Sequence, residues 1–514
     1  MALAVASAVT VAVKVKHRRN RQHLVKISKD QAMEIRTRHC SKALSVSYQN
    51  TGPLMIVKGR KCHLFDENGV AYLDTRNNVA HCGHSHPNIV RAVQSQMTLL
   101  NTNTRYLHPH MVQLVDRLVG GNSSTKTRSG FSQKTPLLPS PLEIVVFCNS
   151  GSEANDLALR LARAYADGST NTIVVDRAYH GHTLATLEVS PYKYECGTER
   201  YQQEQSFDNN QTKNPHHPGS HIYKVPCPDV YRGPYRDPAT AGALYASHVE
   251  EACNYYQNKG ERVRAMIIEG GMSVAGVIVP PPGYLAKSIR AVRKAGGVYI
   301  ADEVQTGFGR LGTTYWAFQQ QQEQSDEKEP VIPDIVTVGK PFGNGMPLAA
   351  VITTREIAAT FENCGVEYFN TFAGNPVACA AGLAVLDTME EENLQENAIK
   401  VGSYLIESFR EMMDRVELIG DIRGSGLFVG IELVRDRATL EPASEETSFI
   451  CSILKSKYHI LTSIDGVHDN VIVVKPPMVF SKKDVDMFAE AFERAVLVDL
   501  PMAGEISSLA KTPT

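Results

Sequence analysis

The stretch Ile335-Val336-Thr337-Val338-Gly339-Lys340 places a lysine directly after an apolar run. A second apolar run, Val298-Tyr299-Ile300-Ala301, leads into Asp302 in the same way. A charge at the end of a buried strand is costly unless it has a partner. In an open α/β sheet, such strand ends form the ligand site. Lys340 and Asp302 are therefore candidate functional residues, although either one alone fits a strand-end charge that reaches solvent.

A third segment, Asn149-Ser150-Gly151-Ser152-Glu153, follows an apolar run and begins a helical pattern. The start of a helix favours a phosphate because its backbone N–H groups are unpaired and its dipole end is positive. Gly151 permits close approach and Ser152 offers a hydroxyl, while Ser150 and Glu153 also fit a capping box. A Schiff-base lysine, an aspartate for a protonated pyridine nitrogen and a phosphate loop together predict pyridoxal 5'-phosphate as cofactor.

Short apolar runs alternate with helical patterns through the middle of the chain, which predicts an α/β fold with a mostly parallel sheet. The expected strands are Ile144–Phe147, Thr172–Val175, Ala265–Ile268, Val298–Ala301, Ile335–Val338 and Ala349–Ile352, and helices are expected over Glu153–Tyr165 and Tyr284–Lys294. Three polar inserts are expected to be solvated surface loops: Gly120–Ser140, Gly197–Ser220 and Gln319–Glu329.

A second, smaller α+β domain is expected from both ends of the chain. Leu54–Val57 and Ala71–Leu73 flank the turn sequence Asp66–Gly69 and predict a hairpin. The C-terminal part predicts helices over Ala378–Glu391, Leu394–Met413 and Lys482–Ala495, and strands over Leu427–Leu433 and Val471–Val474. The expected division is a leader (1–40), the N-terminal part of the small domain (41–100), a large cofactor-binding domain (101–370), the C-terminal small domain (371–500) and a tail (501–514).

Composition places the chain among globular enzymes. Its 514 residues are 43% hydrophobic and 21% charged, and the formal net charge of -2 gives no drive toward nucleic acid or membranes. The ten cysteines form no C-x-x-C pair, which argues against a zinc ribbon or a disulfide scaffold. No apolar stretch reaches the roughly 20 residues of a membrane span. The first 29 residues are basic and free of Asp and Glu, which favours a mitochondrial transit peptide over a cytoplasmic location.

Histidines gather at His81-x-x-His84-x-His86, and two more follow at His108 and His110. A zinc site needs further firm ligands, and only Cys82 stands near. A turn region without metal is therefore the preferred interpretation.

Two single residues complete the candidates. Tyr179 follows a predicted strand, where its ring can stack on a pyridine face or pack in the core. The stretch Arg423-Gly424-Ser425-Gly426 lacks the third glycine of a dinucleotide fingerprint. An arginine in a tight space suits the capture of a carboxylate or a phosphate, and the alternative is a solvated arginine in a surface turn.

From about Val57 to Ala495 the chain resembles class III aminotransferases of the pyridoxal-phosphate fold-type I group. The matching segments are Asn149–Asp156, Tyr179–His182, Ala301–Arg310, Pro333–Lys340, Thr371–Pro376 and Arg423–Leu427. Within that group it most resembles the phospholyases that act on phosphoethanolamine and 5-phosphohydroxylysine. That likeness lies in Asn77–His81, Leu100–Arg105, Asp229–Arg236 and Lys475–Met478.

The resemblance implies a role for each matching position. Lys340 would form the Schiff base and Asp302 would hold the pyridine nitrogen. Gly151 and Ser152 would bind the cofactor phosphate, Tyr179 would stack on the ring, and Gln305 would lie near the phenolic oxygen. Thr371 would reach the cofactor phosphate of the neighbouring subunit, which implies a homodimer or a tetramer. Arg423 would take the carboxylate or phosphate of the substrate.

Two departures bear on the reaction. Many transaminases of the group carry a second glutamate that gates the arginine, and Val274 stands at that position here. Met346 replaces a histidine of the animal phospholyases. The expected activity is a lyase that releases phosphate from a phosphorylated amine, with Tyr231–Arg236 as a possible source of cations. The alternative is a transaminase of the alanine–glyoxylate type. A non-enzymatic interaction protein on this fold would be expected to have lost Lys340.

Overall fold

The computed structural model describes residues 27–120, 136–194, 219–323 and 331–503. The chain divides into two compact units, residues 1–56 and residues 57–514. In the first unit, helix α1 (Lys29–His39) begins with a capping box between Ser28 and Gln31, and a short 3-10 helix, η1, spans Gln49–Thr51. Most of the predicted leader, residues 1–26, and residues 504–514 of the tail lie outside the described ranges.

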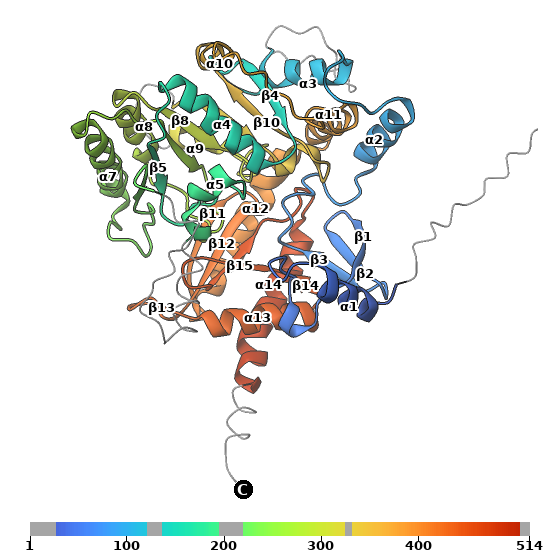
Figure 1. Ribbon diagram of the computed structural model, residues 1–514. Helices are drawn as coiled ribbons and strands as arrows, with labels where there is room; N and C mark the ends of the chain where they lie inside the picture. The colour runs from blue at the N-terminus through green and yellow to red at the C-terminus, as the bar shows by residue number, and fades with distance from the viewer. Residues whose placement is uncertain (1–26, 121–135, 195–218, 324–330, 504–514) are drawn as a thin grey trace, which may run out of the picture. The chain divides into compact units, whose positions relative to one another are not determined.

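A seven-stranded sheet forms the centre of the second unit (Figure 1). Its order is β4 (Ile144–Cys148), β10 (Ala349–Thr353), β9 (Ile335–Val338), β8 (Val298–Asp302), β7 (Ala265–Glu269), β5 (Thr172–Val175) and β6 (Ile222–Val225). The strands from β9 to β6 are parallel, whereas β10 is antiparallel to both of its neighbours. The mostly parallel sheet predicted from the apolar runs is therefore confirmed.

Both faces of this sheet are buried, as expected for parallel strands covered by helices. Alternate residues of a strand point to opposite faces. Ile300 packs in one hydrophobic cluster with α4 (Gly151–Tyr165), and its neighbour Tyr299 packs in another with α8 (Tyr284–Lys294). The remaining helices of this part are α2 (Pro87–Leu99), α3 (Pro109–Val119), α5 (Leu184–Glu188), α7 (Pro238–Asn258), α9 (Ala317–Glu323) and α10 (Arg355–Glu362).

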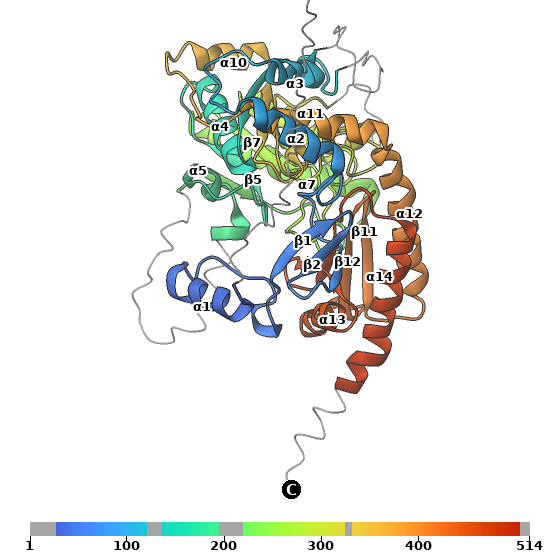
Figure 2. The same cartoon turned by 90° about the vertical axis from the view of Figure 1, so that its right-hand side faces the viewer.

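The two ends of the unit meet in a smaller α+β region. Strand β14 (Ile460–Leu461) pairs in parallel with β3 (Ala71–Asp74), in the order β1 (Ile56–Arg60), β2 (His63–Asp66), β3, β14. Figures 1 and 2 both place these blue strands beside the orange and red C-terminal elements. This confirms the predicted fold class, with a small domain formed by both chain ends, while the proposed domain limits stay a prediction.

A second small sheet follows β11 (Ile419–Ser425), β12 (Phe428–Asp436), β16 (Val471–Val474) and β15 (Ser463–Asp465), with β13 (Glu441–Pro442) beside β12. The helices of this part are α11 (Pro376–Glu391), α12 (Leu394–Met412), α13 (Ser444–Ser456) and α14 (Lys482–Arg494), which continues as η3 (Ala495–Asp499). No helix in the described ranges is long and apolar enough to cross a membrane.

The predicted hairpin has a different first arm. The chain pairs β2, not Leu54–Val57, with β3. The Asp66 carboxylate accepts the N–H groups of Asn68 and Val70, both at 2.9 Å, so the turn closes directly onto its flanking residues.

The insert predictions also need correction. Gln319 belongs to α9, because its side chain accepts the N–H of Trp316 at 3.0 Å and closes the start of that helix. Leu138, at the end of the first insert, is buried. Residues 121–135, 197–218 and 324–329 of the three inserts lie outside the described residues.

Candidate active site

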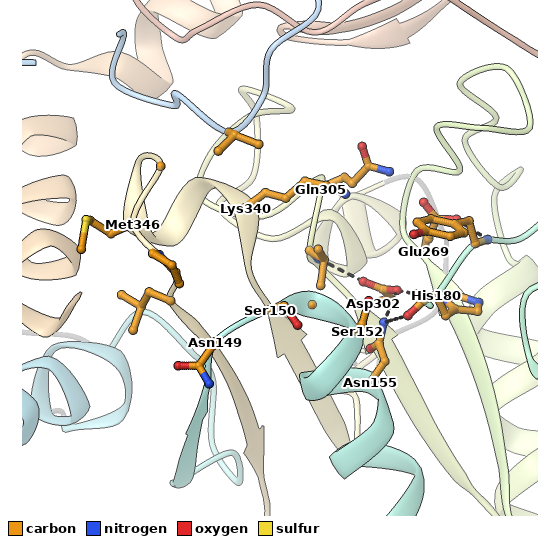
Figure 3. Close-up of a pocket in the computed structure, with 18 residues that line it drawn as sticks. Asn149, Ser150, Ser152, Asn155, His180, Glu269, Asp302, Gln305, Lys340 and Met346 are labelled. Atoms are coloured by element: carbon orange, nitrogen blue, oxygen red, sulfur yellow. Dashed lines mark hydrogen bonds and ion pairs between the residues drawn. The ribbon is translucent and has the colours of Figure 1, made fainter. Parts of the chain in front are cut away.

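A cavity of about 380 Å³ lies at the carboxyl ends of β7, β8 and β9, next to the start of α4 (Figure 3). Its walls are Val79, Asn149, Ser150, Gly151, Ser152, Asn155, Tyr179, His180, Gly181, Glu269, Asp302, Val304, Gln305, Lys340, Gly345, Met346, Pro347 and Leu348. Six predicted site residues are among them: Gly151, Ser152, Tyr179, Asp302, Gln305 and Lys340. Thr371 and Arg423 are not. The fold thus brings together residues that are up to 189 positions apart, because parallel strands end at the same edge of a sheet.

Asp302 is held by three donors. Its Oδ2 accepts from Asn155 Nδ2 at 2.7 Å and from His180 Nδ1 at 2.8 Å, and its Oδ1 accepts the N–H of Val304 at 3.1 Å. Figure 3 shows the first two as dashed lines that converge on the carboxylate. Asn155 is fixed in turn because its Oδ1 accepts from Thr337 Oγ1 at 2.6 Å. Asp302 is only 3% exposed, so its carboxylate is a preorganised negative charge at a buried position.

Lys340 begins the 3-10 helix η2 (Lys340–Gly343), two residues after β9. Burial lowers the pKa of its ammonium to about 8, and the nearby Lys475 ammonium acts in the same direction. The carboxylates of Asp302 and Glu269 act in the opposite direction. A lysine with this pKa has a much larger neutral fraction near physiological pH than an ordinary lysine, and the neutral amine is the form that a Schiff-base nucleophile requires.

Glu269 is a site residue that the sequence reasoning did not assign. It ends β7 beside Asp302, to which it is paired in the sheet register. Its Oε1 accepts the N–H of Tyr179 at 3.3 Å, and its Oε2 is buried with no hydrogen-bond partner among the described residues. Burial, together with the charge of Asp302, raises the pKa of this carboxyl to about 7. The sequence does contain a signal for Glu269, because an apolar run leads directly into it just as one leads into Asp302.

The start of α4 is capped by a side chain and also leaves backbone N–H groups available to a ligand. Ser150 Oγ accepts the N–H of Glu153 at 3.2 Å, so Ser150 caps the helix. The Glu153 carboxylate accepts the N–H of Asn149 at 2.7 Å and not that of Ser150, so only half of the predicted capping box is formed. The N–H groups of Gly151 and Ser152 have no partners within the helix because they lie in its first turn. A Cβ at position 151 would lie 2.6 Å from the Val304 side chain, so only glycine fits there.

The donor set of this cavity fits pyridoxal phosphate. Asp302 can pair with a protonated ring nitrogen, Lys340 can form the covalent link, and the first turn of α4 can receive the phosphate. Gln305 lines the cavity, and its side-chain amide is fixed because its Oε1 accepts from Asn78 Nδ2 at 2.9 Å. The half-buried Tyr179 ring forms one wall. The roles of the individual residues stay predictions, and the structure shows that these side chains share one cavity.

Arg423 lies outside the cavity in strand β11, so the alternative of a solvated surface turn is wrong. Its Nη1 contacts Asp421 Oδ2 at 2.8 Å and Glu432 Oε2 at 2.6 Å, and its Nε donates to the Gly276 carbonyl at 2.8 Å. Glu432 also pairs with Arg232, a residue of the basic segment Tyr231–Arg236. That segment does not line the cavity either.

Thr371 is exposed on the surface of the chain, as a residue that reaches a neighbouring subunit would be. The histidines of the metal-like motif bind separate groups. His81 contacts the Phe308 carbonyl and Arg310, His84 contacts Asp74, and His86 contacts Glu392. Within the described residues, no group of three or more histidine, cysteine, aspartate or glutamate side chains is placed to hold a metal ion.

Comparison with known proteins gives a consistent result. The family model of class III aminotransferases matches residues 44–496. A Drosophila melanogaster protein named alanine–glyoxylate aminotransferase 2-like is 44% identical over 91% of this chain and 87% of its own length. The Caenorhabditis elegans ethanolamine-phosphate phospho-lyase homolog 1 is 36% identical over 89% of this chain and 91% of its own length. Human mitochondrial alanine–glyoxylate aminotransferase 2 is 34% identical over 91% of this chain and 86% of its own length.

Solved structures extend this result to the fold. An Arthrobacter phospholyase in complex with phosphoethanolamine superposes with a TM-score of 0.77 at 32% identity, and the match covers 91% of this chain and 99% of that one. A pyridoxal-phosphate-bound amine transaminase from an uncultivated Pseudomonas species gives a TM-score of 0.72 at 27% identity, and the match covers 88% of this chain and 96% of that one.

Proposed function

Since the chain belongs to the class III aminotransferase family of fold-type I pyridoxal-phosphate enzymes, we propose that it is a phospho-lyase acting on a phosphorylated amine. The substrate would be phosphoethanolamine or 5-phosphohydroxylysine. Two relatives support this choice: the nematode phospho-lyase homolog and the Arthrobacter phospholyase with its bound phosphoethanolamine.

The observation that carries the proposal is the state of Arg423. Two carboxylates, Asp421 and Glu432, already occupy its guanidinium, and Val274 stands where a transaminase of this family would have its gating glutamate. To bind the carboxylate of an amino acid, Arg423 would have to leave the buried Glu432, and breaking such a pair costs about 3 to 5 kcal/mol. An amine without a carboxylate, such as phosphoethanolamine, avoids this cost.

The residues of the cavity can carry out the elimination. When bound, pyridoxal phosphate supplies the electron sink that makes the carbon next to the amine acidic. Lys340 Nζ, in its neutral form, removes the proton from that carbon. The buried Asp302 carboxylate keeps the ring nitrogen protonated. The Cα electron pair then forms a double bond to the next carbon, and phosphate leaves with the electrons of the C–O bond. Water hydrolyses the resulting enamine, so phosphoethanolamine and water give acetaldehyde, ammonia and phosphate.

The reaction is tested by product stoichiometry. With no amino acceptor present, phosphoethanolamine should yield inorganic phosphate and ammonia in equal amounts over many turnovers. Ethanolamine, which has no phosphate to lose, is the matched control substrate and should yield no ammonia. Turnover that stops after one equivalent and resumes only on addition of pyruvate or glyoxylate would instead identify a transaminase. That second candidate is favoured by the 44% identity to the alanine–glyoxylate aminotransferase 2-like protein.

We also propose that the protein is a homodimer whose sites each use Thr371 of the other subunit. Thr371 stands among exposed apolar side chains, since Val366, Phe369 and Phe372 are 61%, 43% and 69% exposed. Arg105 links this segment to another one, because it contacts Glu367 at 3.5 Å and lies over the Phe369 ring at 4.4 Å. That second segment contributes further exposed apolar residues: Leu99, Leu100, Tyr106 and Leu107. An apolar face of this kind favours association.

A hybrid experiment tests the shared site. Lys340→Ala and Thr371→Ala chains should each have little activity alone. After subunit exchange, half of the random dimers are hybrids with one intact site, so about a quarter of the wild-type activity is expected. A mixture of Lys340→Ala with wild type should show dilution only. No gain in the first mixture, with exchange verified by mass spectrometry, would mean that each site is built by one chain.

A mitochondrial location is proposed from the basic N-terminal segment and from the name of the human relative. Imaging the chain with a fluorescent protein at its C-terminus tests this, and a diffuse cytoplasmic signal would contradict it.

A further inference from the structure

Residues 366–372, which we call the Thr371 segment, have an outward and an inward side. The stretch from 366 to 370 is neither helix nor strand, and the exposure of its last side chains alternates. Phe369 and Thr371 are exposed, on the face that is proposed to meet a second subunit. Tyr368 and Asn370 are half-buried. These two residues turn toward the body of their own chain.

The inward side chains contact the residues that lead into α4. Asn149 Nδ2 donates to Asn370 Oδ1 at 2.8 Å. One residue earlier, Cys148 ends β4, is fully buried and has its Sγ 3.4 Å from the Tyr368 hydroxyl. Two consecutive residues are therefore held by the Thr371 segment, directly before the cap and the first turn of α4.

The Asn149 side chain depends on this contact. Asn149 lines the cavity, where Figure 3 shows it just before the start of α4. Its Oδ1 is buried with no hydrogen-bond partner, so the bond to Asn370 is the one hydrogen bond of this side chain within the described ranges. Loss of that bond would leave both polar atoms of the amide unpaired, which is costly. The side chain would then turn toward another partner, and the backbone that follows it would be held less firmly.

The opposite end of the first turn is anchored by a different residue. Ser152 Oγ accepts the N–H of His182 at 3.1 Å, which leaves the Ser152 hydroxyl proton free for a ligand. The N–H groups of Gly151 and Ser152 thus lie between two anchors, one from His182 and one from Asn370 through Asn149. Donors that are fixed before a ligand arrives bind it more tightly, because less order remains to be imposed.

We propose that Asn370 is a positioning residue for the cofactor phosphate, and that it acts through Asn149 by holding the start of α4 in the orientation that receives this phosphate. The Thr371 segment would then serve two phosphate sites, that of its own chain through Asn370 and that of the neighbouring subunit through Thr371. This inference rests on the placement of the cofactor phosphate at the start of α4. It holds for a lyase and for a transaminase alike.

The test compares two forms of the cofactor. Pyridoxal has the ring and the aldehyde of pyridoxal phosphate but lacks the phosphate, so both can form the same covalent link with Lys340. Their dissociation constants are measured on the cofactor-free protein from the absorbance of the bound ring. The ratio of the two constants reports the phosphate contact, because a substitution that disturbs Lys340 or the ring site weakens both ligands equally.

In Asn370→Ala the advantage of pyridoxal phosphate over pyridoxal should fall by roughly three- to tenfold, the value of one hydrogen bond. Asn149→Ala should have at least the same effect. The double variant should be no weaker than Asn149→Ala alone, because Asn370 acts through Asn149. Asn363→Ala is the matched control, since it removes an exposed asparagine at the end of α10, and it should leave the ratio unchanged.

Two results of the binding experiment would overturn the proposal. One is an unchanged ratio in Asn370→Ala, and the other is a double variant in which the effects of the two substitutions simply add. If Asn370→Ala does not fold, an unchanged ratio in Asn149→Ala has the same meaning. Release of phosphate or ammonia does not enter this experiment, so the positioning role and the lyase function can fail separately.

Hybrid dimers show whether Asn370 serves its own chain. In a mixture of Asn370→Ala with Lys340→Ala chains, the intact lysine and the weakened phosphate site belong to the same chain. No gain in activity is therefore expected at a cofactor concentration that saturates only the wild type. The mixture of Thr371→Ala with Lys340→Ala is the comparison, and it should gain activity. A gain with Asn370→Ala would place its role across the subunit interface and overturn the assignment to its own chain.

Discussion

Replacement of Lys340 by alanine is expected to abolish covalent attachment of the cofactor and to reduce turnover by at least about 10³-fold, since the main proton-transfer group is lost. Lys340 is the lysine among the residues that line the cavity, and it lies at the strand edge that also holds Asp302. Borohydride reduction of the loaded wild-type enzyme should fix the cofactor on the peptide that contains Lys340. The same treatment of Lys340→Ala should leave no labelled peptide.

Lys475 provides the internal control for this assignment. Lys475 is a buried lysine whose charge lowers the pKa of Lys340. A Lys475→Gln variant should still be labelled on Lys340. Label found on Lys475 in the wild-type enzyme would show that the covalent link belongs to the other lysine.

The pH dependence of Schiff-base formation follows from the same residue. Only the neutral amine attacks an aldehyde, and burial with the adjacent Lys475 lowers the pKa of Lys340 to about 8. In the cofactor-free protein, the rate of Schiff-base formation should therefore rise with pH up to about 8 and then level off. A rate that keeps rising toward pH 10 would indicate an ordinary exposed lysine.

The Asp302→Asn substitution should raise the activation free energy by about 3 kcal/mol and so lower the turnover rate on the order of 10²-fold, as for other preorganised charge partners. The carboxylate accepts three hydrogen bonds and is almost fully buried. An amide at this place carries no charge, so it cannot keep the pyridine nitrogen protonated. Exchange of the substrate Cα proton with solvent, measured by NMR, should slow by the same factor.

A modified cofactor shows whether the Asp302→Asn variant is slow because the ring nitrogen has lost its charge or because the site is distorted. Pyridoxal phosphate methylated on the ring nitrogen carries a permanent positive charge and should restore part of the activity of Asp302→Asn. The variant should also still bind the cofactor covalently through Lys340. Near-normal turnover with the unmodified cofactor would mean that another group holds the ring nitrogen.

Much of the fold could be predicted because its signals are local. Buried strands appear as short apolar runs, so β5, β9 and β16 have the predicted bounds, and α8 has the predicted periodicity. Strand β11 was not predicted, because its residues Ile419–Ser425 include two glycines and two charges and give no apolar run. The first arm of the hairpin was misplaced because the Asp66 turn, and not apolarity, sets its register.

Several features of the site could not be predicted because they depend on partners distant in the sequence. The His180 contact with Asp302 joins residues 122 positions apart, and Arg423 was expected to be open to substrate before its contact with Glu432 was known. Lys475 was noticed only as part of a motif. Its relation to Lys340 arises where the C-terminal sheet meets the large sheet.

The sequence by itself predicted the fold class and the cofactor, and it singled out Lys340 and Asp302, which the structure places in the wall of one cavity. It could do so because a charge that ends an apolar run is a local signal of a buried functional group. Only the tertiary structure decided which charges face the cavity and which neutralise each other, as Asp421 and Glu432 neutralise Arg423 while Asp302 and Lys340 line the cavity. Burial and pairing depend on distances between segments far apart in the chain, and these exist only once the sheets have packed.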